Sequence, residues 1–388
     1  MLNQPSGLYC RNEGCRVGEV MISELILVIN PGSTSTKVAI YEGDKELDAL
    51  ELKHSAKELA QFHSINDQME FRKAAVLGYL SDKHIDAGEL SAIACRGGVV
   101  GQLESGAYLV DKSFAEASLN SPAPHPANLS PVIGYEIARE VNERSGAADD
   151  STKALKAYVY DAVCGCGRPT RVFTITGIAE IEKPFLTHVL NSRAVSIEQA
   201  RRDGVMLHDT TYIVTHLGGG ITTNLIKAGK VMDFVGDDEG GLSPERSGGL
   251  PVRPLVKLCY SGKFDEKEMQ KKLKGEGGLM AYLGTNDLRE VERRMDQGDE
   301  TARLVFDAMV LQIAKDIGSL ATVVCGKVDK IILTGGMAYS KAFTGELKER
   351  VGFLAPVSII PGTFEMEALA HGVLRVLHGE EQARVLEK

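Results

Sequence analysis

The stretch "LILVINPGSTSTKVAIYE", residues 25–42, places two short apolar runs on either side of a turn. A plain hairpin needs only two turn residues, such as Asn-Gly. This turn is longer, and Gly32 allows its backbone N–H groups to face outward. We therefore expect a hairpin with strands over 25–29 and 37–41 and a turn that receives an anion. The turn offers this anion the polar residues Asn30, Ser33, Thr34, Ser35 and Thr36, and Lys37 closes it.

The composition is that of an ordinary globular protein with an acidic balance. Of the 388 residues, 43% are hydrophobic and 25% are charged. A chain of this length predicts about two domains. The net charge of −9 argues against nucleic acid as a partner, because binding a phosphate backbone needs a basic face. No apolar run approaches the roughly 18 residues of a membrane span, so we expect no membrane association.

The cysteines indicate reduced thiols and a cytoplasmic location. There are seven, an odd number at irregular spacing, which does not fit a disulfide framework. Cys164 and Cys166 form a C-x-C pair without a second pair at zinc spacing, so we expect no metal there. Residues 1–20 are polar and lack the apolar middle of a signal peptide. Since Met21 opens an apolar run, we expect 1–20 to be an extension outside the fold.

The opening pattern returns in the second half of the chain. Residues 210–234, "TTYIVTHLGGGITTNLIKAGKVMDF", again read as strand, small-residue turn, strand, turn and strand. Each opening precedes alternating helices and buried strands, with helices expected at about 66–82, in the later part of 125–141, at about 300–325 and at 365–379. This predicts a duplicated α/β fold with a ligand in the cleft between the halves. Two unrelated domains are the alternative.

Three glycine-bearing turns, each after a strand, indicate a bound nucleotide. They are 30–36, 216–221 and 334–337. Glycine permits close backbone approach, and N–H groups that face outward bind phosphate oxygens. The Walker A and dinucleotide fingerprints are absent, as are G-x-S-x-G and H-E-x-x-H. The sequence therefore disfavours P-loop, Rossmann, serine hydrolase and zincin chemistry.

Two arginines have positions suited to a phosphoryl group in transfer. Arg96 follows a buried strand, and Arg246 lies in "GGLSPERSGGLP", which is too rich in Gly and Pro for regular structure. Each binds either an anion or a structural carboxylate, and the surrounding glycines favour the anion. His188 and His216 are candidate donors, although a single histidine is more often structural. Asp161 closes a buried strand and could hold Mg²⁺, or could simply be a turn residue.

These stretches together resemble the acetate kinase family of the acetate and sugar kinase, Hsp70 and actin superfamily, and within it the members that phosphorylate butyrate. The resemblance rests on "LVINPGSTSTKVAIYE", "HLGGGI", "SPERSGGLP", "GTNDLREVE", "LTGGMAYS" and "EMEALAHGVLRVL", and it spans 22–378. It implies two duplicated ribonuclease H-like (actin-like ATPase) domains with an active-site cleft between them. The first would comprise 21–164 plus 368–388, and the second, nucleotide-binding domain 165–367.

The resemblance also implies an activity. ATP would phosphorylate a short-chain carboxylate, butyrate, reversibly and directly, giving ADP and an acyl phosphate with Mg²⁺ present. Acetate, propionate or branched acids are alternative substrates, because one methylene changes binding by only about 1–3 kcal/mol. A non-catalytic ATP-binding regulator on the same fold is the alternative outside enzymes. Family members form dimers or larger assemblies, so a homodimer or higher homo-oligomer is expected.

Roles follow from the resemblance position by position. Asn30, Ser33 and Ser35 match the first phosphate hairpin, which Lys37 closes. The two arginines would hold the carboxylate and the phosphoryl group, His188 would stabilise the transition state, and Asp161 would lie near Mg²⁺. The Mg²⁺-associated glutamate would be Glu365 or Glu367, with Glu365 preferred by its distance to Ala370. The second phosphate loop would comprise His216, Gly218, Gly219 and Gly220, and the adenosine-side loop Gly335 and Gly336. The sequence departs from the family after Asp161, in "CGCGRP".

Overall fold

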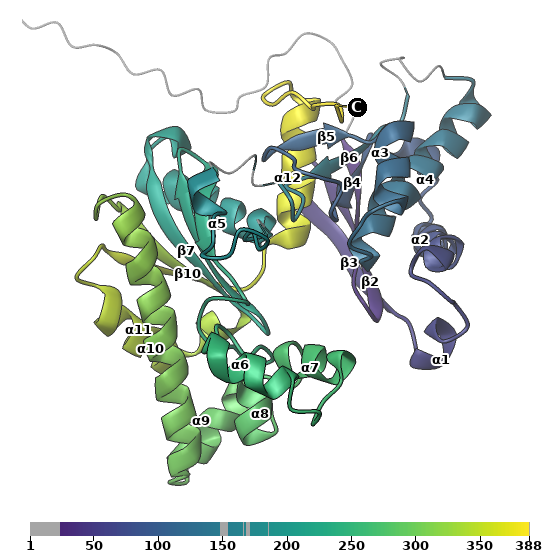
Figure 1. Ribbon diagram of the computed structural model, residues 1–388. Coiled ribbons are helices and arrows are strands. Elements are labelled where there is room, and N and C mark those ends of the chain that lie inside the picture. The colour runs from purple at the N-terminus through teal and green to yellow at the C-terminus, as the bar shows by residue number, and fades with distance from the viewer. Residues whose placement is uncertain (1–23, 148–153, 166, 168–170, 185, 388) are drawn as a thin grey trace, which may run out of the picture.

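The computed structural model describes residues 24–147, 154–165, 167, 171–184 and 186–387. The predicted extension 1–20 and Cys166 lie outside this set. Two sheets, one of six strands and one of five, form the centres of two lobes, each flanked by helices (Figure 1). Within the described residues, we find no helix whose length and apolar content would let it span a lipid bilayer.

The first sheet has the order β3-β2-β1-β4-β6-β5. The hairpin of β1 and β2 is antiparallel, as predicted, and β4 and β6 continue the sheet in parallel. The sequence did not reveal β3, because most of its side chains are exposed and it lacks apolar alternation. The strands are β1 (Leu25–Pro31), β2 (Ser35–Glu42), β3 (Lys45–Lys53), β4 (Ala92–Arg96), β5 (Ala107–Leu109) and β6 (Ala157–Tyr160).

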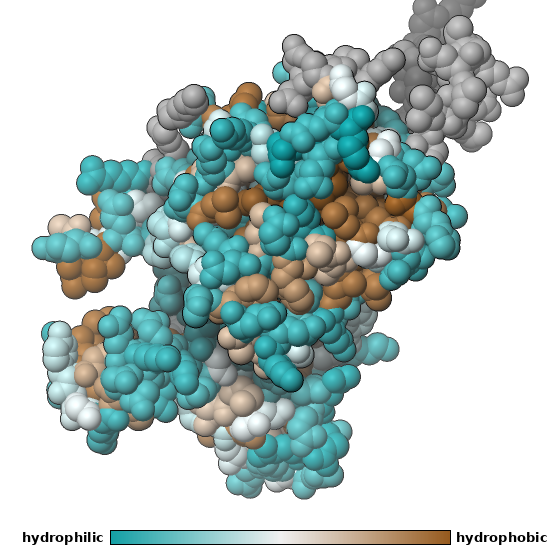
Figure 2. Space-filling view, turned by 90° about the vertical axis from the view of Figure 1, so that its right-hand side faces the viewer, coloured by the Kyte–Doolittle hydropathy of each residue, from teal (hydrophilic) through white to brown (hydrophobic). Residues whose placement is uncertain are grey.

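Helices cover both faces of this sheet. On one face, α4 contributes Ile133, Ile137 and Val141 at helical spacing to a core that it shares with α2 and α3. On the other face, α12 packs against β1, β4 and β6. From the side of the first lobe, the surface is a mixture of hydrophilic and hydrophobic residues (Figure 2). The helices are α1 (Ala56–Leu59), α2 (Met69–Asp82), α3 (Lys112–Leu119), α4 (Leu129–Ser145) and α12 (Glu365–Leu377).

The second sheet has the order β11-β10-β7-β8-β9 and repeats the opening hairpin motif, as predicted. Its parallel strands β10 and β11 lie beside β7. The strand β11 was not predicted. The strands are β7 (Thr211–Leu217), β8 (Ile221–Lys227), β9 (Lys230–Val235), β10 (Lys330–Gly335) and β11 (Val357–Pro361).

Helices α10 and α11 cover one face of the second sheet, and α5 covers the other. The long helix predicted to end near Cys325 ends at Val323, and Leu304 on it is 69% exposed. The sequence did not reveal α5, whose polar residues outnumber its apolar ones. The helices are α5 (Val189–Asp203), α6 (Val252–Cys259), α7 (Glu266–Leu273), α8 (Leu279–Leu283), α9 (Leu288–Asp296), α10 (Glu300–Val323) and α11 (Lys341–Val351).

The chain passes between the two sheets twice. The first passage follows β6 and leads to α5, and the second follows β11 and leads to α12. These two helices contact each other, and α12 lies between the lobes in Figure 1. The loops at the ends of β1, β4, β7 and β10 carry most of the predicted site residues. Since β1 and β4 belong to one sheet and β7 and β10 to the other, the two crossings determine how these loops are placed relative to one another.

Candidate active site

The first predicted phosphate turn joins β1 to β2. The N–H of Gly32 donates to the carbonyl oxygen of Ser35 at 2.8 Å, which closes the turn. Ser33 is exposed, and the Ser35 hydroxyl donates to Glu51 Oε1 at 2.8 Å. Lys37 is exposed on β2. Ser33 and Lys37 are therefore accessible from outside the core, whereas the Ser35 hydroxyl is engaged by Glu51.

Arg96 and Glu365 form a close ion pair at the ends of β4 and α12. Nη1 of Arg96 lies 2.7 Å from Oε1 of Glu365, and Asn30 donates to Oε2 of the same carboxylate at 3.0 Å. Burial opposes the ionisation of Glu365, but Arg96 and Asn30 outweigh it and lower its pKa to about 2. Glu367 instead lies 3.9 Å from His371. The structure thus brings Glu365, and not Glu367, beside Arg96.

One polar atom of Arg96 lacks a protein partner. Its Nε is buried and has no hydrogen-bond acceptor among the described residues. A buried donor without an acceptor costs about 1–3 kcal/mol, so such a group is suited to a ligand. The guanidinium of Arg96 therefore pairs with Glu365 through Nη1 and keeps its Nε–H available for a ligand.

His188 and His216 stack face to face. Their ring centroids are 4.3 Å apart, with 15° between the ring planes. Nδ1 of His188 pairs with the Thr222 hydroxyl at 2.9 Å, and Asn191 Nδ2 donates to Nδ1 of His216 at 2.9 Å. Burial, with the neighbouring histidine and Arg96, lowers the pKa of His188 to about 3. Burial also lowers the pKa of His216 to about 4, so both rings are neutral at pH 7.

Arg246 lies beside the second phosphate loop. An ideal Cβ on Gly220 would be 3.7 Å from Nε of Arg246. That Nε is 3.3 Å from Oδ2 of Asp237, and Nη1 is 3.5 Å from Oε2 of Glu245. Arg246 therefore has carboxylate partners in this structure, as the structural alternative expected, although both distances are long. After burial and the neighbouring histidine, the positive charges of Arg96 and Arg246 also help to lower the pKa of His188.

A cavity of about 710 Å³ extends from this loop toward β10. Gly218, Gly219 and Gly336 line it, together with residues at the start of α9. Gly335 has φ of 93°, and a Cβ there would lie 2.4 Å from the carbonyl oxygen of Leu217. Only glycine therefore lets the end of β10 approach the end of β7 so closely. Of the three turns that the sequence assigned to the nucleotide, the second and third meet at this cavity, and the first does not line it.

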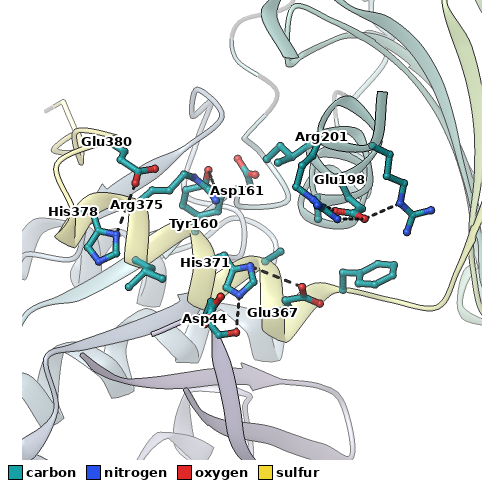
Figure 3. A pocket seen from close by; sticks show the side chains of 16 residues that line it. Asp44, Tyr160, Asp161, Glu198, Arg201, Glu367, His371, Arg375, His378 and Glu380 are labelled. Atoms are coloured by element: carbon teal, nitrogen blue, oxygen red, sulfur yellow. Dashed lines mark hydrogen bonds and ion pairs between the residues drawn. The ribbon is translucent and has the colours of Figure 1, made fainter. Parts of the chain in front are cut away.

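Asp161 points elsewhere. It has φ of 45°, its Oδ1 accepts from the Gly106 N–H at 2.8 Å, and the carboxylate pairs with Arg193 of α5. It lines a second cavity, of about 670 Å³, between α5 and α12 (Figure 3). The structure thus gathers Asn30, Arg96, His188, His216, Arg246 and Glu365 but turns the Asp161 carboxylate toward Arg193. Among the described residues, no group of three or more His, Cys, Asp or Glu side chains could hold a metal ion by itself.

Sequence reasoning missed several residues that support this site. Asn191 contacts both His216 and Thr334, and Thr222 orients His188. Arg193 holds Asp161, and Asp237 holds Arg246. One signal was available, because Thr and Asn within the buried strand β8 must find polar partners. The two residues on α5 gave no signal, because that helix was not predicted.

The chain resembles known proteins over most of its length. A family model described as the acetokinase family matches residues 188–351. "Probable butyrate kinase 2" of Caldanaerobacter subterraneus subsp. tengcongensis is 41% identical over 362 residues, which cover 93% of this chain and 99% of that protein. "Butyrate kinase 2" of Clostridium acetobutylicum is also 41% identical over 362 residues, which cover 92% and 98%.

Solved structures share the fold. The acetate kinase of Porphyromonas gingivalis matches with a TM-score of 0.74 at 19% identity, covering 92% of this chain and all 100% of that one. A propionate kinase of Francisella tularensis matches with a TM-score of 0.71 at 18% identity, covering 90% and 98%. The predicted α/β fold of the actin-like ATPase class is confirmed. On the strength of its full-length relatives, the chain belongs to the acetokinase family.

Proposed function

We propose that this protein is a kinase that phosphorylates butyrate with ATP, reversibly, giving ADP and butyryl phosphate. The observation that carries the proposal is the buried Nε of Arg96, which has no acceptor among the described residues, together with Arg246 beside the glycine turn at Gly220. Relatives that are 41% identical and bear the name butyrate kinase support the choice of acid. A non-catalytic ATP-binding protein on this fold would have no use for both arginines.

The chemistry needs positioning more than proton transfer. A carboxylate is already ionised at neutral pH, so no general base is required. One carboxylate oxygen bonds to the γ-phosphorus while the bond from that phosphorus to the β-γ bridging oxygen of ATP breaks, and ADP leaves. In the proposal, Arg96 orients the acid and Arg246 offsets charge on the equatorial phosphoryl oxygens. His188 and His216, both neutral, offer N–H donors without adding a charge that would titrate near pH 7.

The nucleotide phosphates are assigned to the first two glycine turns, one from each lobe. They would contact Asn30, Ser33, Ser35 and Lys37 from one lobe, and His216 with Gly218, Gly219 and Gly220 from the other. The adenosine would occupy the 710 Å³ cavity beside Gly335 and Gly336, whose volume lies in the range usual for ligand pockets.

Mg²⁺ is part of the proposal, and Glu365 fits it better than Asp161. Mg²⁺ prefers one or two carboxylates and keeps several waters. Both carboxylates are ion-paired, but Glu365 lies with Asn30 and Arg96, whereas Asp161 pairs with Arg193 and lines the other cavity. When bound, the ion would neutralise phosphate charge.

The division into domains, the assembly and the location remain proposals. Packing of α12 on the first sheet supports a first domain of 21–164 plus 368–388 and a second of 165–367, whose closure would exclude water. Exposed apolar side chains on α6 and just after it, among them Val252, Val256 and Tyr260, support a homo-oligomer, which light scattering would test. The proposed use of ATP as a substrate supports a cytoplasmic location.

A hydroxamate assay with ATP and Mg²⁺ over straight and branched acids of two to six carbons tests the function. We expect the highest kcat/KM with butyrate. An optimum at acetate, propionate or a branched acid would replace the substrate while keeping the reaction. ATP binding without any acyl hydroxamate would overturn the enzyme assignment.

A further inference from the structure

A buried arginine without a counter-ion lies behind the β1–β2 turn. Arg72 of α2 is completely buried. Its Nε and Nη2 donate to Gln68 Oε1 at 3.1 and 3.0 Å, and its Nη1 donates to the Thr36 hydroxyl at 3.0 Å. Among the residues that the structure describes, no carboxylate pairs with it. Burying a charge without an opposite charge is costly, so this cation is expected to have a role beyond packing.

The same guanidinium holds the turn itself. Nη1 donates to the carbonyl oxygen of Ser35 at 2.9 Å, and Nη2 to that of Ser33 at 3.3 Å. The backbone N–H of His54 donates to the carbonyl oxygen of Thr34 at 2.8 Å. Three consecutive carbonyl groups are therefore drawn toward the core.

This arrangement prepares the opposite side of the turn for an anion. Within the described part of the chain, the N–H groups of Ser33 and Thr34 have no acceptor, and both residues are exposed. Successive backbone N–H groups that face outward form an anion-binding concavity. Carbonyl dipoles that face inward keep their negative ends away from that anion.

We propose that Arg72 is a positioning residue for polyphosphate: it sets the shape of the turn and supplies a buried positive charge whose counter-ion is the bound nucleotide's phosphate chain. The inference rests on the proposed function, in which this turn holds the phosphates. Arg72 touches no reacting atom and acts through the backbone of Ser33 and Ser35. It should therefore affect ligands in proportion to their phosphate charge and leave adenosine binding unchanged.

Gln68→Glu separates the charge of Arg72 from its geometry. The new carboxylate would accept the same two hydrogen bonds and give Arg72 an internal counter-ion. We expect the thermal midpoint to rise while ADP affinity, measured by calorimetry, falls about fivefold or more, because a nearby charge is neutralised in a poorly screened site. Adenosine affinity should not change. Gln297→Glu, which adds the same charge at the exposed residue that follows α9, is the matched control.

Arg72→Met and Arg72→Lys test the geometry. We expect Arg72→Met to weaken ADP binding about tenfold or more and raise the KM for ATP without changing the KM for butyrate, since charged hydrogen bonds that order the turn are lost. Arg72→Lys should recover part of the affinity. If Arg72→Met does not fold, Gln68→Glu alone decides.

The outcomes separate the two proposals. Unchanged ADP affinity in Gln68→Glu, or an equal loss of ADP and adenosine affinity, would overturn the role of Arg72 while wild-type turnover still supports the kinase. Failure of the wild-type protein to bind ADP at all would overturn both.

Discussion

Nη1 of Arg96 lies 2.7 Å from Oε1 of Glu365, which joins the end of β4 to the first turn of α12. Because α12 follows β11 of the second sheet, this ion pair lies where the chain crosses between the lobes. An arginine proposed to hold the acid is thus paired to the glutamate proposed for the metal. The carboxylate substrate would therefore compete with Glu365 for Arg96, and Mg²⁺ would compete with Arg96 for Glu365.

Arg96→Ala and Arg246→Ala should each lower turnover by about 10²-fold or more, because each removes a charged donor used in the transition state. Hydroxamate formation at saturating butyrate measures the loss, and circular dichroism checks the fold. Arg139→Ala, on the surface of α4, is the control and should retain wild-type turnover. Near-normal rates in both variants would remove the two arginines from the site.

The stacked histidines predict a loss of stability in mild acid. The folded pKa values of about 3 for His188 and about 4 for His216 lie below the ordinary value of 6.5. The unfolded chain therefore binds protons below pH 6.5 that the folded chain does not, and the free energy of unfolding falls as the pH falls. The expected slope is about 1.4 kcal/mol per pH unit for each histidine.

Urea denaturation between pH 7.5 and 5.0 would measure this slope, with His216→Asn as the comparison. The variant should show a shallower dependence on pH, because one of the two groups no longer titrates. An identical slope in both proteins would mean that His216 takes up a proton as readily in the folded chain as in the unfolded chain.

The Asp161–Arg193 pair predicts strong coupling in a double-mutant cycle. Asp161→Asn or Arg193→Met alone leaves one buried charge unpaired, so each should cost about 3–5 kcal/mol of unfolding free energy. The double variant should cost much less than the sum. The KM for Mg²⁺ in Asp161→Asn gives a separate readout: an unchanged value would limit Asp161 to its structural pair with Arg193, and a large rise would return it to the metal site.

Neighbouring glycines give a matched pair of variants. Gly335→Ala should lower the free energy of unfolding by about 1–3 kcal/mol, because alanine is strained at positive φ and its Cβ would clash with Leu217. Gly336→Ala should leave stability unchanged, since its Cβ would have no atom within 4 Å. Equal stability of the two variants in thermal denaturation would contradict the close approach of β10 to β7.

Local pattern and chemistry were sufficient for much of the fold. The alternation in β2 and the turn after β1 identified the hairpin, and Ile133, Ile137 and Val141 identified α4. The same logic failed for β3 and α5. Polar residues outnumber apolar ones in both elements, so neither stretch shows a clear strand or helix periodicity of apolar residues.

The sequence by itself determined the duplicated α/β pattern, the three glycine turns and the candidate arginines, because these depend on residue type and on spacing along one strand or turn. Only the tertiary structure decided which charges meet. Glu365 rather than Glu367 reaches Arg96, Asp161 turns to Arg193, and Arg72 lies beneath the phosphate turn. Each of these contacts joins elements far apart in the chain, and only the packing of α2, α5 and α12 against the sheets determines their distances.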